Sequence, residues 1–108
     1  MNKKRTTSDR AQGAAYGMFI GDALAMPVHW YYDTRALRRD YGEVVDFLRP
    51  RKSHPDSILW RSSFQPPHKS VDILHEQRQY WGVKGVHYHQ FLQAGENTLN
   101  VKLARELL

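Results

Sequence analysis

The stretch Gly13-Ala14-Ala15-Tyr16-Gly17-Met18-Phe19-Ile20-Gly21-Asp22-Ala23-Leu24-Ala25-Met26-Pro27 decides the fold of this chain. Its three glycines recur every four residues, so in a helix they lie on one strip. Asp9 and Gln12 fit a capping box, which predicts a helix over about residues 10–26 that the proline ends. Three glycines in a helix cost roughly 2–3 kcal/mol relative to alanine. We therefore expect this strip to pack closely against another backbone.

Two further helices are predicted from their capping residues. Asp33 caps a short helix over residues 34–41, and Gly42 supplies its C-terminal stop. Thr98 caps a last helix, whose apolar face carries Leu99, Leu103 and Leu107. The sequence sustains no alternation of apolar and polar residues with period two, so the predicted fold class is all-α.

The region between these helices is less regular. Residues 44–48 are expected to be extended or a short strand, and Ser70 is expected to cap a helix over residues 71–80. Residues 49–70 contain four prolines together with large apolar side chains, which predicts a long, irregular loop packed over the helices. Long ordered loops of this kind are usually functional.

Length and composition exclude several classes of protein. The chain has 108 residues, a formal net charge of +5 and no cysteine, so a disulfide scaffold and a cysteine zinc site are excluded. No stretch of ~20 apolar residues is present to span a membrane. Residues 1–25 loosely resemble a secretory signal, but Asp22 interrupts the apolar segment, so we expect a cytoplasmic protein. Because the last helix ends within an apolar pattern, we expect residues 1–108 to be the N-terminal fragment of a longer domain.

The positive charge is concentrated in two places, which are Lys3, Lys4, Arg5 and Arg10, and then Arg35, Arg38, Arg39, Arg49, Arg51 and Lys52. A basic nucleic-acid-binding module is one interpretation, and it predicts an affinity that falls steeply with salt. No recognised binding motif accompanies the charge, so we favour a solvated surface and expect no nucleic-acid partner.

Asp22 and the aromatic run after Pro27 are the first candidate site. Asp22 falls on the packed side of its helix, and a buried carboxylate needs hydrogen-bond partners or a cation. It either bonds the backbone of a neighbouring loop or serves a functional site. The run His29-Trp30-Tyr31-Tyr32 either stacks on a base or ribose or covers the core.

Two later segments are weaker candidates. His87-Tyr88-His89 places two imidazoles on one face if the backbone is extended, as a transition-metal pair or as ordinary loop histidines. Gly95-Glu96-Asn97-Thr98-Leu99-Asn100 presents free N–H groups at a helix start. Such a start binds an anion such as a phosphate, or is simply a capped helix.

Taken together, residues 13–27 resemble the opening helix of the ADP-ribosylglycohydrolase family, which reads roughly G-x-x-x-G-D-A-L-G-x-P-x-E. The continuation through His29-Trp30-Tyr31-Tyr32-Asp33 is similar to the branch that includes the lens J-crystallins. His87-Tyr88-His89 and residues 95–100 resemble the next block of that branch. The resemblance covers the whole chain in outline but about a third of a family domain.

The resemblance implies an all-α domain that binds two magnesium ions and hydrolyses the N- or O-glycosidic bond between ADP-ribose and a protein side chain or related acceptor. The family's Thr-Asp-Asp metal block aligns with Thr98-Leu99-Asn100, where Leu99 has no metal-binding atom. Magnesium prefers anionic oxygen ligands, so the standard site is incomplete.

The site residues expected from this resemblance fall into three groups. Asp22 and His29 are the catalytic candidates, and Trp30 and Asn97 are expected to contact ADP-ribose or an ADP-ribosylated substrate. Glu96, Thr98 and Asn100 are the candidate ligands for Mg²⁺. Antiparallel packing of the first and last helices is expected to bring these residues to one rim. The alternative is a non-catalytic, crystallin-like or ADP-ribose-binding protein that has lost the standard metal site.

Overall fold

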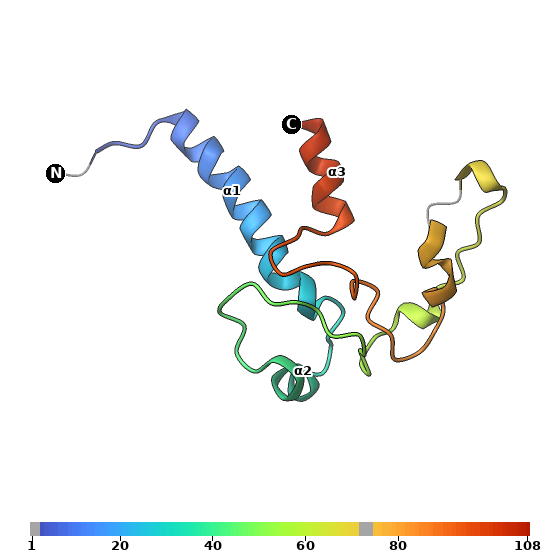
Figure 1. Cartoon of the computed structure of the whole chain (residues 1–108). Coiled ribbons are helices and arrows are strands. Elements are labelled where there is room, and N and C mark those ends of the chain that lie inside the picture. The colour runs from blue at the N-terminus through green and yellow to red at the C-terminus, as the bar shows by residue number, and fades with distance from the viewer. Residues whose placement is uncertain (1–2, 72–74) are drawn as a thin grey trace.

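The computed structural model describes residues 3–71 and 75–108. Its elements are α1 (Thr7–Ala25), η1 (Met26–Val28), α2 (Thr34–Tyr41), η2 (Leu59–Arg61), η3 (Lys69–Val71), η4 (His75–Tyr80) and α3 (Leu99–Leu107), where η denotes a 3₁₀-helix. The described residues form no strand, and an isolated bridge joins Ser53 to Val86. The all-α prediction is therefore confirmed (Figure 1).

Helix α1 begins three residues earlier than predicted. Its N-cap is Thr6, whose hydroxyl accepts a hydrogen bond from Asp9 N, while Asp9 Oδ2 accepts one from Thr6 N. Asp9 is thus the third helical residue of a capping box and not the cap itself. The helix ends at Ala25, and Pro27 lies in the 3₁₀ turn that follows, as expected of a residue without a backbone donor.

Helix α2 has the bounds predicted for it. Asp33 Oδ1 accepts a hydrogen bond from Arg35 N at 2.8 Å, which caps the first turn. Gly42 ends the helix with a φ of 68°, a left-handed conformation that glycine adopts without steric strain.

The connecting region differs from the prediction in two places. Ser70 lies within η3 instead of capping a helix, whereas residues 44–48, expected to be extended or a short strand, form no strand. Residues 75–80 are 3₁₀-helical, whereas an α-helix was predicted, and residues 72–74 of that range lie outside the described residues. The irregular loop over 49–70 is packed in part on the segment that follows it. Phe64 contacts Trp81 edge to face, and Lys84 lies over the Trp60 ring.

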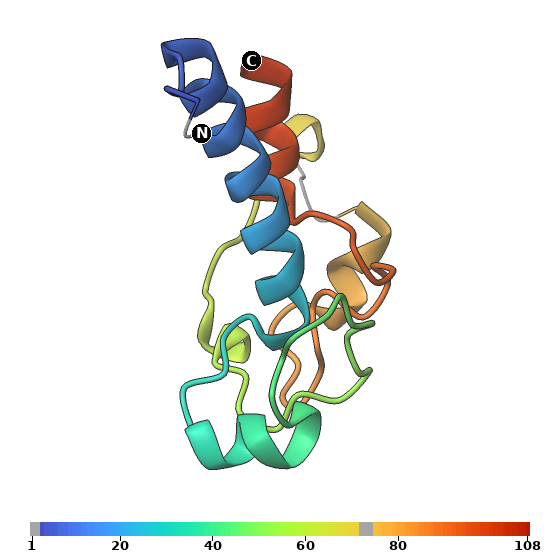
Figure 2. The same ribbon diagram turned by 90° about the vertical axis from the view of Figure 1, so that its left-hand side faces the viewer.

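Helices α1 and α3 run antiparallel and contact each other, with the C-terminal end of α1 beside the start of α3 (Figures 1 and 2). This arrangement brings Asp22, near the end of α1, into contact with Thr98 at the start of α3. The expected packing of the glycine strip is absent from the described part of the chain, because a Cβ added at Gly13, Gly17 or Gly21 would meet no atom within 4 Å. The described contacts to α1 are made near its C-terminal end instead.

Candidate functional site

Asp22 is the centre of a hydrogen-bonded junction between α1 and the start of α3. Its Oδ2 accepts bonds from Thr98 N at 2.7 Å and from Asn97 Nδ2 at 3.0 Å. Its Oδ1 accepts a bond from the Thr98 hydroxyl at 2.7 Å. Asn97 Nδ2 also donates to the Phe19 carbonyl at 2.7 Å. The carboxylate therefore bonds the loop before α3, which is the first of the two alternatives that the sequence offers for Asp22.

This junction also accounts for the anion site predicted at residues 95–100. Thr98 is the N-cap of α3, but its side chain does not cap the helix, because its hydroxyl donates to Asp22. A negative charge beside the N-terminus of a helix is stabilised by the helix dipole. In this structure the Asp22 carboxylate of the protein itself supplies that charge. It occupies the position in which the sequence suggested an external phosphate.

His29 follows η1 and lies beside this junction. A small cavity of about 100 Å³ is lined by Asp22, Ala25, Met26, His29 and Thr98. Burial lowers the pKa of the His29 imidazole, while the nearby Asp22 carboxylate raises it. His29 is therefore a hydrogen-bonding group that favours its neutral form beside a carboxylate. Asp22, His29 and Thr98 are the sequence-predicted residues that share this cavity.

Trp30 and His89 pack on His29. The Trp30 ring stacks on the His29 ring with centroids 3.9 Å apart, and His29 Nδ1 lies 3.0 Å from His89 Nε2. Trp30 has a φ of 66°, an unusual conformation for a residue other than glycine. Such strain marks positions that the surrounding structure strongly constrains. One face of Trp30, the residue expected to contact ADP-ribose, is thus occupied by the His29 imidazole.

His87 and His54 are buried core residues that sequence reasoning did not identify as such. His87 Nε2 lies 2.7 Å from the Pro27 carbonyl, and His87 Nδ1 accepts a bond from His89 N at 3.1 Å. His54 Nε2 lies 2.9 Å from the His29 carbonyl, and His54 Nδ1 is buried without a partner. His87 is therefore a neutral ring protonated at Nε2, because its Nδ1 accepts, and His54 donates from Nε2. Their partners lie far away in sequence, so no local pattern indicates them.

The structure does not pair His87 with His89 through their ring nitrogens. His87 bonds the Pro27 carbonyl and His89 bonds His29, so their imidazoles have different partners. The expectation of ordinary loop histidines is wrong for His87, whose exposed fraction is 0%. Among the described residues, no group of three or more His, Cys, Asp or Glu side chains is placed to bind a metal ion.

Glu96 and Asn100 lie outside the cavity at Asp22. Glu96 Oε1 is 3.5 Å from Lys102 Nζ, and Glu96 Oε2 accepts a bond from Gln93 N. The Thr98 hydroxyl donates to Asp22, and Asn100 is exposed on α3. Glu96, the one carboxylate among the candidate ligands, is thus bonded to a lysine and a backbone amide in this structure.

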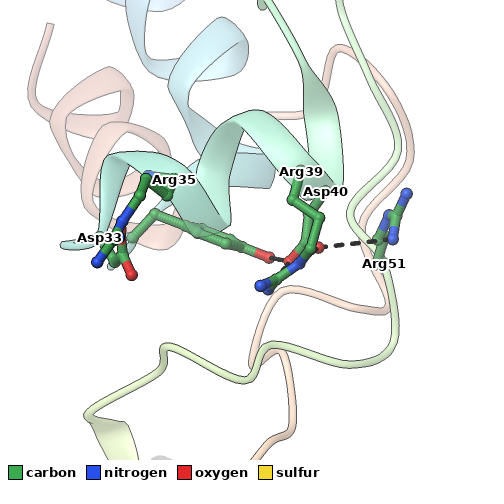
Figure 3. A network of polar contacts seen from close by, with 6 residues as sticks. Asp33, Arg35, Arg39, Asp40 and Arg51 are labelled. Carbon is green, nitrogen blue, oxygen red and sulfur yellow. Dashed lines mark hydrogen bonds and ion pairs between the residues drawn. The ribbon is translucent and has the colours of Figure 1, made fainter.

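The basic cluster around α2 is partly neutralised by acidic neighbours (Figure 3). Asp40 Oδ1 lies 3.0 Å from Arg39 Nε and 3.9 Å from Arg51 Nη1, while Asp33 pairs with Arg35 at 3.8 Å. The Tyr31 hydroxyl also donates to Asp40, at 2.8 Å. Hydrogen bonds from Arg39 and Tyr31 lower the pKa of Asp40. This cluster therefore presents less free positive charge to a polyanion than its sequence suggests.

Comparison with known proteins identifies the family. The ADP-ribosylglycohydrolase family model matches residues 3–104, nearly the whole chain. The chain belongs to the ADP-ribosylglycohydrolase family. No curated protein and no solved structure gives a significant match. In this family member, the matched region includes both the Asp22–Thr98 junction and the His29–His89 pair. No helix among its described residues is long and apolar enough to cross a membrane.

Proposed function

We propose that the protein is a hydrolase that cleaves an N- or O-glycosidic bond to ADP-ribose. The observation that carries this proposal is the ADP-ribosylglycohydrolase match over residues 3–104. The cavity at Asp22, His29 and Thr98 supports it, because a carboxylate and an imidazole line the same recess. Paired titratable groups in a recess are typical of hydrolytic sites.

The proposed roles follow from the contacts of each residue. Hydrolysis adds water across the bond between the anomeric carbon and the acceptor atom. His29 is the proposed group that accepts the proton of that water, because burial lowers the pKa of its imidazole and favours the neutral ring. Asp22 fixes Asn97 and Thr98 at the rim, where Asn97 is the proposed contact to the substrate. The face of Trp30 away from His29 is the proposed surface for a sugar or base.

Replacing His29 by alanine tests this proposal. We expect the H29A variant of the full-length protein to lose roughly 100-fold or more in kcat on an ADP-ribosylated protein, since general acid–base groups contribute on this scale. The measurement is release of ADP-ribose from a labelled substrate. The matched control is H68Q, which removes an exposed imidazole of the irregular loop and is expected to keep the parental rate. Equal rates for H29A and the parent protein would remove His29 from the mechanism.

A second candidate function is binding of ADP-ribose without hydrolysis, as in a non-catalytic protein of the J-crystallin-like branch. The observation that favours it is the Asp22 carboxylate, whose two oxygens are both bonded within the protein. Calorimetry with ADP-ribose separates the two candidates. Binding without any release of ADP-ribose from labelled substrates supports the second function and contradicts the first.

Magnesium enters the proposal through the family resemblance, with Glu96 as its candidate carboxylate. On this hypothesis E96Q, which keeps the side-chain size and removes the charge, binds Mg²⁺ about tenfold more weakly than the parent full-length protein. K102M is the matched variant, because it removes the cation 3.5 Å from Glu96 and is expected to raise the affinity. Titration followed by calorimetry gives both values. If E96Q binds as tightly as the parent, Glu96 is not a ligand.

A further inference from the structure

We propose that His89 is a positioning residue, which fixes the orientation and the tautomer of His29 through the hydrogen bond between the two imidazoles. The atoms that meet are His29 Nδ1 and His89 Nε2, at 3.0 Å. The two residues are sixty positions apart in the chain, so the fold, and not a local turn, brings them together. The chemical consequence rests on the role proposed above for His29.

The two rings meet edge to edge along the line of this hydrogen bond. Their centroids are 5.2 Å apart, which exceeds the 3.0 Å between the bonded nitrogens by about one ring width. Their planes differ by 13°. Trp30 lies over both rings, at 3.9 Å from the His29 centroid and 5.2 Å from the His89 centroid. The pair is therefore nearly coplanar and covered on one face by a single indole.

His89 is itself anchored to the backbone that carries His29. Its N–H donates to His87 Nδ1 at 3.1 Å, and His87 Nε2 bonds the Pro27 carbonyl at 2.7 Å. Pro27 is two residues before His29. These bonds close a ring of contacts through residues 27–29 and 87–89. Movement of His89 relative to His29 would break at least one bond to a buried group, and the loss of such a bond is unfavourable.

A neutral pair of this kind holds one proton between its facing nitrogens. Either His29 Nδ1–H donates and His89 accepts, or His89 Nε2–H donates and His29 accepts. In both cases the tautomer of one ring dictates that of the other. A neutral imidazole without such a partner exchanges between tautomers, so the bond to His89 determines which nitrogen of His29 is available to a substrate.

The test uses three variants of His89 in the full-length protein. H89Q keeps a polar group near the position of Nε2, whereas H89N is too short to reach His29 and H89F keeps a ring under Trp30 but has no nitrogen. Y88F, in the same segment, is the control, because no hydrogen bond of the Tyr88 hydroxyl is described. Nitrogen-15 spectra of the histidine rings report the tautomer of His29, and turnover of an ADP-ribosylated protein reports its consequence.

We expect a single His29 tautomer in the parent protein, Y88F and H89Q, and a mixture in H89N and H89F. We expect kcat to fall roughly 10- to 100-fold in H89N and H89F, with KM nearly unchanged, because misorientation of a reacting group has effects of this size. An unchanged His29 spectrum in a folded H89N or H89F overturns the proposal. If the tautomer changes as expected but the parent protein has no hydrolase activity, the positioning role stands and the proposed function fails.

Discussion

Replacing Asp22 by alanine is expected to lower the free energy of unfolding by about 3–5 kcal/mol, a large fraction of the stability of a typical domain. The variant removes the acceptor of three hydrogen bonds, which are donated by the Thr98 backbone N–H, the Thr98 hydroxyl and the Asn97 side-chain amide. Each unsatisfied group costs about 1–3 kcal/mol where it stays buried, and Thr98 is 6% exposed. Chemical denaturation of the full-length protein measures the change.

The control for this prediction is D46A, which removes an exposed carboxylate that bonds its neighbour, Phe47 N. We expect D46A to change the stability by less than about 0.5 kcal/mol. T98V removes the Thr98 hydroxyl and keeps the backbone donor, so it measures the contribution of the hydroxyl alone. Its loss of stability should not add to that of D22A, because both variants remove the same 2.7 Å bond. Equal stabilities for D22A and D46A would show that the junction does not hold α3 against α1.

The features that were predicted correctly depend on local chemistry. Asp33 and Gly42 bound α2, because capping depends on residues within one turn. Thr98 occupies the N-cap position of α3 as predicted, although its side chain bonds Asp22 and does not cap the helix. The position of Asp22 beside Thr98 followed from antiparallel packing of the two helices. At α1 a capping box was predicted correctly, but its position was wrong, since the N-cap is Thr6 and not Asp9.

The histidine arrangement was not predictable, because it depends on contacts between distant segments. His29 bonds His89 and His54 bonds the His29 carbonyl, from three separate parts of the chain. Periodicity reports which face of an element is apolar, but not which loop covers it.

Acidification is expected to destabilise the protein through His87. Burial lowers the pKa of His87 to about 4 from 6.5, while its bond to the Pro27 carbonyl opposes the shift. Between these two values the unfolded chain binds more protons than the folded protein, so the free energy of unfolding falls as the pH falls. Above pH 6.5 this contribution is fully present, and it is lost progressively toward pH 4. For a ring with no exposed surface we expect a loss of about 2–3 kcal/mol between pH 7 and pH 4.

The structural reason is that both nitrogens of the His87 ring form hydrogen bonds, Nε2 to the Pro27 carbonyl and Nδ1 to His89 N. Protonation would place a hydrogen on Nδ1, directly against the His89 N–H that it now accepts.

H87Q keeps a donor for the Pro27 carbonyl but does not titrate, so its stability should be lower at pH 7 and depend less on pH. Denaturation at several pH values between 7.5 and 4.5 measures both effects, with Y88F as the control that keeps the parental slope. Because burial also lowers the pKa of His89 to about 4, H87Q should retain part of the slope. A parental slope in H87Q would mean that His87 does not carry the acid sensitivity.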